Sequence, residues 1–183
     1  MKIMPVFFAF LSCAVLPATA LADDILTSRT HVQSAVGLCQ GALPSFEGAL
    51  RKRPLAINNE GTTASFVSCT VDSEAAYAAQ QVQDIAILFT NRGAATAVNC
   101  TLVDGIATAT AGPLAGVGVP EFFPKTLNLA AGTAGGTHGK LGWNLTDKPA
   151  GFFLPAVSCL LPPGVEINFV QHIYDQLIPV PTP

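Results

Sequence analysis

Apolar and polar residues alternate along much of this chain, at the two-residue period that is typical of a half-buried β-strand. In the run 64–71, Val67, Cys69 and Val71 fall on one side, and mostly polar residues fall on the other. Such runs predict strands that bury one face in a common core. The predicted strands are 64–71, 82–90, 98–102, 125–129, 141–145, 152–161 and 165–174.

Turn-forming residues separate these runs. Asn91-Arg92-Gly93 predicts a β-hairpin between the strands on either side, and the glycine-rich stretch 132–139 predicts a hairpin loop. The segment 74–81 suits a short helix, and 28–37 suits a short helix or an edge strand. Many short strands without a long helix predict an all-β fold, a disulfide-stabilised antiparallel β-sandwich of the immunoglobulin-like or jelly-roll kind.

The N-terminus has the pattern of an export signal. A basic residue is followed by the largely apolar run 3–16 and by Ala20-Leu21-Ala22 ahead of two aspartates. We therefore expect a signal peptide at 1–22, cut after Ala22, and a single β-sandwich domain at 23–183 in the periplasm or outside the cell. The segment Phe10-Leu11-Ser12-Cys13 loosely resembles a bacterial lipobox and leaves open a lipid-modified Cys13.

Four cysteines follow the predicted signal, namely Cys39, Cys69, Cys100 and Cys159. An even number of cysteines in an oxidising compartment predicts two disulfide bonds. No Cys-x-x-Cys pair and no nearby histidine occurs, which argues against a zinc knuckle or a thioredoxin-type redox pair. The strand pattern points Cys69, Cys100 and Cys159 inward beside apolar neighbours, so we expect a structural role for them.

In the segments 91–104 and 158–164 the chain resembles small secreted proteins of Gram-negative bacteria that have a similar signal, four cysteines and a late Cys-x-Leu-Pro-Pro-Gly element. The resemblance is carried by Cys100-Thr101-Leu102 and by Cys159-Leu160-Leu161-Pro162-Pro163-Gly164. It implies a disulfide-stapled β-sandwich in which Cys39 pairs with Cys69 and Cys100 pairs with Cys159. It implies no catalytic residue, because that group has no established activity.

Charge and motif content argue against several classes of function. With 9 basic and 12 acidic residues the formal net charge is −3 and no basic stripe is present, so no nucleic-acid partner is expected. Beyond the signal, no apolar run reaches the roughly 20 residues of a transmembrane helix. The sequence contains no metal-binding or cofactor-binding motif, so neither a metal nor a cofactor is expected. The stretch 132–140 fails as a phosphate-binding loop, because Ala134 and Leu141 occupy required positions.

The strand 165–174 carries the candidate binding site. Its alternation predicts one apolar face and one outward face rich in functional side chains. The apolar face would comprise Val165, Ile167, Phe169 and Ile173, and the outward face Glu166, Asn168, His172 and Tyr174. Alternate residues on a strand lie roughly 6.5–7 Å apart, close enough to line one small polar site. The alternative interpretation is an ordinary solvated sheet face.

Histidines and one basic segment offer further chemistry. His31, His138 and His172 are isolated in sequence and no Gly-x-Ser-x-Gly element accompanies them, so no nucleophilic triad is indicated. Arg51-Lys52-Arg53-Pro54 suits an anionic surface glycan or a lipid headgroup, but a solvated loop is the alternative. The single tryptophan, Trp143, fits either a sugar platform or core packing.

These observations favour an exported, non-catalytic binding or structural protein whose partner is an unidentified protein or glycan. A small hydrolase is one alternative, with a site assembled from distant residues such as His172 with Glu166 or Asp175. A surface-assembly subunit that completes a partner's sheet through an exposed edge is another. A convergent polar pocket would favour the hydrolase, and an unpaired apolar groove would favour the assembly subunit.

Overall fold

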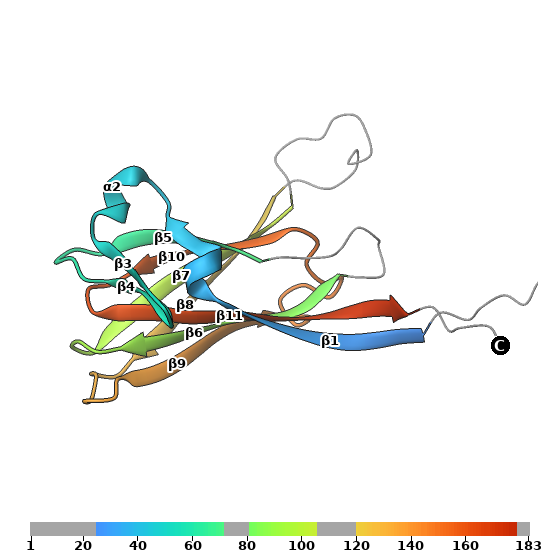
Figure 1. Cartoon of the computed structure of the whole chain (residues 1–183). Helices are drawn as coiled ribbons and strands as arrows, with labels where there is room; N and C mark the ends of the chain where they lie inside the picture. Colours follow the sequence, from blue (N-terminus) through green and yellow to red (C-terminus); the bar gives the residue numbers. More distant parts are fainter. Residues whose placement is uncertain (1–24, 72–80, 106–119, 179–183) are drawn as a thin grey trace, which may run out of the picture.

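The computed structural model describes residues 25–71, 81–105 and 120–178, which form two antiparallel sheets. Sheet A has the order β3(Leu50–Arg53), β4(Ala56–Asn59), β11(Val165–Ile178), β6(Val82–Asn91) and β9(Thr137–Asn144), and β1(Ile25–Ser34) also pairs with β11. Sheet B has the order β2(Cys39–Gly41), β5(Ser65–Thr70), β10(Pro155–Leu161), β7(Thr96–Asp104) and β8(Glu121–Leu129). The one-turn helices α1(Ala35–Leu38) and α2(Pro44–Glu47) complete the fold (Figure 1). The predicted disulfide-stabilised β-sandwich is confirmed.

The core lies between the sheets and is built by the predicted alternation. Ile85, Ile87 and Phe89 of β6 are buried from sheet A, and Val98 and Leu102 of β7 are buried from sheet B. Each fully buried side chain of this size stabilises the fold by about 1.5–3 kcal/mol.

Trp143 belongs to this core rather than to a surface platform, because it is fully buried. Its Nε1 donates a hydrogen bond to the Phe123 carbonyl at 2.8 Å. That bond connects β9 of sheet A to β8 of sheet B, so it holds the two sheets together along one side.

Two disulfides join neighbouring strands of sheet B. Cys39 of β2 is bonded to Cys69 of β5, and Cys100 of β7 is bonded to Cys159 of β10, which is the pairing that the resemblance implies. In both bonds the cysteines are directly opposite across an antiparallel pair, and all four side chains are buried in the core. The inward direction predicted for the strand cysteines is therefore confirmed.

The two predicted hairpins, which would pair β6 with β7 and β8 with β9, are wrong. β6 and β7 are consecutive in sequence but belong to different sheets, and the same holds for β8 and β9. The buried amide of Asn91 explains why the chain crosses from β6 in sheet A to β7 in sheet B. Its Nδ2 donates hydrogen bonds to the carbonyls of Ala94 and Ala130, each at 2.8 Å, and its Oδ1 accepts one from Gly93 N at 2.9 Å. These bonds turn the chain from one sheet to the other instead of closing a two-residue turn.

Two sequence segments have a different structure from the one expected. The basic segment Arg51-Lys52-Arg53-Pro54 is not a loop as a whole, because its first three residues belong to β3. Strands β3 and β4 form a hairpin. His138, expected in a glycine-rich loop, lies within β9. Of the helix-or-edge alternatives for 28–37, both occur, because β1 is an edge strand and α1 follows it.

A β-bulge in β11 reverses the direction of its later side chains. Ile167 and Phe169 are paired with consecutive residues of β6, so Asn168 is the extra residue. Because one added residue exchanges the two faces of a strand, Val170 and His172 share the inner face with Ile167. Beyond the bulge, β11 runs alongside β1 away from α2 (Figure 1).

Some expectations lie outside the described residues. The signal peptide at 1–22, its cleavage after Ala22 and the lipobox cysteine Cys13 are among them. So is nearly all of the short helix expected at 74–81.

We expect Asn91→Ala to lower the free energy of unfolding by about 2–4 kcal/mol, because it leaves buried donor and acceptor groups of the corner without partners. Asn128→Ala, on an exposed position of β8, is the control and should change it by only about 0.5 kcal/mol. Urea denaturation of both variants provides the measurement. Equal, small losses would show that Asn91 does not hold the corner.

Candidate functional site

The bulge divides the four residues predicted to share one outward face. Glu166 and Asn168 line a pocket on the outer face of sheet A. His172 is 2% exposed and points inward, with its ring 5.1 Å from His31 and 5.6 Å from Tyr174. The predicted common face of Glu166, Asn168, His172 and Tyr174 is therefore wrong, because the alternation was extended through the bulged residue.

The dyads considered for a hydrolase are not formed by this arrangement. His172 lies on the inner face of β11, whereas Glu166 lies on the outer face. Asp175 also lies on the face of the β1–β11 pair opposite to His172, and its Oδ2 accepts a hydrogen bond from Gln83. Neither carboxylate can therefore work together with His172.

A row of side chains across sheet A forms the centre of the candidate site. The successive cross-strand partners in this row are Asn58 of β4, Glu166 of β11, Thr90 of β6 and His138 of β9. The pocket over this row, called the sheet A pocket below, has a volume of about 340 Å³. It is lined by Arg53, Pro54, Leu55, Ala56, Thr90, Arg92, His138, Glu166 and Asn168.

Glu166 and Arg92 form an ion pair on one side of the pocket. Glu166 is only 6% exposed, and its Oε1 accepts a hydrogen bond from Arg92 Nε at 2.6 Å. The Arg92 side chain is 50% exposed. The hydrogen bond and the negative charge of Glu166 raise the pKa of Arg92 above its usual value, so the guanidinium remains charged. Because Glu166 uses only Nε, the two Nη groups of Arg92 can bind a ligand.

The hydroxyl of Thr90 fixes the hydrogen-bonding roles of its two neighbours. Thr90 Oγ1 donates to Asn168 Oδ1 at 2.7 Å and lies 2.9 Å from His138 Nδ1. A hydroxyl has a single hydrogen, so His138 Nδ1 must be the donor in the second bond. An imidazole that donates from Nδ1 and carries no second proton has an acceptor at Nε2, and the Asn168 amide retains its NH₂ group for donation.

The hairpin of β3 and β4 supplies the opposite wall. Arg53 is paired with Glu60 through both Nε, at 3.1 Å, and an Nη group. Leu55, in the turn of this hairpin, is 81% exposed, and Pro54 precedes it. This wall therefore combines a cation with an exposed apolar surface.

A buried amide oxygen lies beside Glu166 in the central row. The Oδ1 atom of Asn58 is buried and has no hydrogen-bond partner within residues 25–71, 81–105 and 120–178. An acceptor without a donor in the described part of the molecule costs free energy, about 1–3 kcal/mol for a neutral group. It adds an unused polar group to the neighbourhood of the pocket.

Sequence reasoning identified parts of this site but did not combine them. The basic segment with Arg53, His138 and the pair Glu166 and Asn168 were each recognised separately. Thr90 and Arg92 were missed as functional residues, since Thr90 occupies an ordinary polar position of a strand and Arg92 a turn. Only the strand order brings these segments together.

Comparisons with known proteins add little to the geometry. No family model and no curated protein sequence matches the chain. One similar solved structure is a GH26-CBM35 β-(1,4)-mannanase of Podospora anserina, with 8% identity and a TM-score of 0.35; the match covers 84% of this chain and 28% of that chain. Another is Desmodium yellow mottle tymovirus, with 12% identity and a TM-score of 0.39; the match covers 95% of this chain and 99% of that chain. These TM-scores are low, and nothing about function follows from them.

The described residues contain neither a metal-binding cluster nor a membrane-spanning helix. Within them, no group of three or more His, Cys, Asp or Glu side chains is placed to hold a metal ion. No helix in the described part of the chain is long and apolar enough to span a membrane.

We expect Arg92→Met to lower the free energy of unfolding by about 2 kcal/mol, because it leaves the nearly buried carboxylate of Glu166 without its charged donor. The double variant Arg92→Met/Glu166→Gln should recover most of this loss, since a neutral amide is easier to bury than a charge. Chemical denaturation of the wild type, both single variants and the double variant gives the coupling. A double variant no more stable than Arg92→Met would contradict the ion pair as the cause.

Proposed function

We propose that this protein is an exported, non-catalytic binding protein that holds an acidic sugar in the sheet A pocket. The observation that carries the proposal is the set of hydrogen-bonding groups around Thr90. Arg92 offers its Nη groups and Asn168 offers its NH₂ group from the same side of the sheet. Paired donors that include a guanidinium suit a carboxylate, because charge-assisted bonds to a planar anion are among the strongest in proteins.

The remaining groups of the pocket suit the rest of such a ligand. His138 Nε2 can accept a hydrogen bond from a hydroxyl group, which a simple carboxylate does not have. Pro54 and exposed Leu55 offer an apolar surface for the C–H face of a sugar ring. A hexuronic acid combines a carboxylate, hydroxyl groups and an apolar ring face, so it matches all three features.

A binding function has more support than hydrolysis in this pocket. Thr90 is 1% exposed and its hydroxyl is engaged by two neighbours, so it is not available as a nucleophile. Glu166 is held by Arg92 and nearly buried, which does not suit a carboxylate that must exchange protons with a substrate.

Export is part of the proposal. The N-terminal pattern at 1–22 supports cleavage after Ala22 and release into the periplasm or the medium. Two disulfides suit an oxidising compartment of that kind. The resemblance to small secreted Gram-negative proteins supports the same location.

Calorimetric titration with tetragalacturonate and with its fully methyl-esterified form tests the proposal. We expect the acid form to bind at least about tenfold more tightly, since one charge-assisted hydrogen bond contributes about 1.5–3 kcal/mol. Asn168→Asp should weaken this binding by about tenfold or more, because the isosteric carboxylate still accepts from Thr90 but repels the ligand.

The matched control is Asn99→Asp in sheet B. Asn99 Oδ1 accepts a hydrogen bond from Thr126 Oγ1 at 2.7 Å, as Asn168 does from Thr90, but it lies on the outer face of the other sheet. This variant should bind tetragalacturonate as the wild type does. Equal binding of the acid and the ester, or equal loss in both variants, would overturn the proposal.

A further inference from the structure

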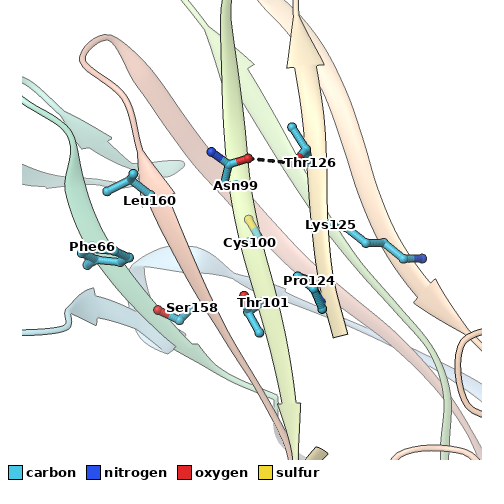
Figure 2. Close-up of a pocket in the computed structure, with 9 residues that line it drawn as sticks. All are labelled: Phe66, Asn99, Cys100, Thr101, Pro124, Lys125, Thr126, Ser158 and Leu160. Atoms are coloured by element: carbon cyan, nitrogen blue, oxygen red, sulfur yellow. Dashed lines mark hydrogen bonds between the residues drawn. The ribbon is translucent and has the colours of Figure 1, made fainter. Parts of the chain in front are cut away.

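The outer face of sheet B carries a second hollow surface, called the sheet B groove below. Figure 2 shows the residues that line it. Its volume is about 380 Å³. One row of cross-strand partners that lines it runs from Phe66 of β5 through Leu160 of β10 and Asn99 of β7 to Thr126 of β8. The groove therefore spans four strands of the sheet.

A second row lies two residues further along the same strands. Ser158 of β10 is paired with Ser68 of β5 and with Thr101 of β7, and Thr101 is paired with Pro124 of β8. These two rows contain hydroxyl groups, one amide and apolar surface, but no charged side chain. Hydroxyl and amide groups both donate and accept hydrogen bonds, so they suit a neutral ligand rich in hydroxyls.

The lysine that borders the groove does not make it basic. Figure 2 shows the side chain of Lys125 directed away from the groove. Its Nζ donates to Asp147 Oδ2 and to the Gly142 carbonyl, both at 2.7 Å. The lysine charge is therefore paired with a carboxylate that does not line the groove.

Two phenylalanine rings are exposed on this side of the molecule. Phe66 is 44% exposed beside the groove, and Phe122, paired with Val103 one row beyond Thr101, is 65% exposed. A flat aromatic surface beside hydroxyl and amide groups suits the apolar C–H face of a pyranose ring as well as its edge.

A second copy of the chain suits this surface less well. Two copies related by a twofold axis would place one hollow against the other and leave unfilled space between them. Serine is depleted in protein interfaces, and two serines lie in the second row. The shape and composition therefore favour a ligand that enters the groove.

We propose that the sheet B groove binds a neutral, extended glycan. The chain lies across the strands, with a sugar ring on Phe66 and its hydroxyl groups bonded to Asn99, Thr101 and Ser158. This site is separate from the sheet A pocket and does not depend on the acidic-sugar proposal. Together the two faces would let one molecule hold a neutral and an acidic polysaccharide.

Calorimetric titration of the mature protein with cellohexaose and with chitohexaose tests the proposal. Binding of either glycan is expected, and Phe66→Ala should weaken it by about tenfold, the effect of losing one stacking ring. Asn99→Asp should also weaken it, because its carboxylate cannot donate. Asn168→Asp, on the other sheet, should leave it unchanged.

Thermal unfolding of each variant shows that the fold is retained. Failure of both glycans to bind the folded wild type would overturn the proposal, and so would binding that Asn168→Asp weakens as much as Asn99→Asp does. Concentration-dependent dimerisation in sedimentation that Asn99→Asp abolishes, without glycan binding, would assign the groove to a second copy instead. Tetragalacturonate binding is measured separately, so failure of one proposal is distinguishable from failure of the other.

Discussion

The bulge at Asn168 is the constraint on which the arrangement of functional side chains depends. β11 is the central strand of sheet A, pairing with β6 on one side and with β4 and then β1 on the other. A regular strand would place Glu166, Asn168 and His172 on one surface. The extra residue instead leaves the first two beside Arg92 outside and sends His172 into the interior beside His31. The same strand thus lines a polar pocket at one end and contributes at the other to a partly buried cluster of the His31, His172 and Tyr174 rings.

The two outer faces differ in their polar and charged side chains because of which strands meet on them. The β3–β4 hairpin, the corner after β6 and strand β9 bring Arg53, Arg92 and His138 onto the outer face of sheet A. The rows of sheet B that line its groove contain neutral residues, and Lys125 is drawn away by Asp147. Both disulfides lie within sheet B, so the neutral face is supported by strands that are covalently joined in pairs. A rigid support of this kind suits a ligand that contacts several strands at once.

The fold class could be predicted from the sequence because alternation reports burial directly. The inward cysteines and the strands around Val67 and Ile87 followed from that periodicity. Strand pairing could not be predicted, because a turn such as Asn91-Arg92-Gly93 suits either a hairpin or a crossing between sheets, and the choice depends on distant partners of Asn91 such as the Ala130 carbonyl. The bulge was also invisible, since Asn168 fits the alternation as a polar residue. Half of the predicted site was consequently placed on the wrong face.

Nuclear magnetic resonance of the labelled protein during addition of tetragalacturonate tests most directly whether the bulge builds a site for an acidic sugar. The largest shifts are expected at the Asn168 side-chain NH₂, at Arg92 Nε and at the ring of His138, which are neighbours only because of the strand order. The Asn99 side-chain NH₂ on the other sheet should not move. Shifts confined to Asn99 and its neighbours, or no shifts at saturating ligand, would contradict the account.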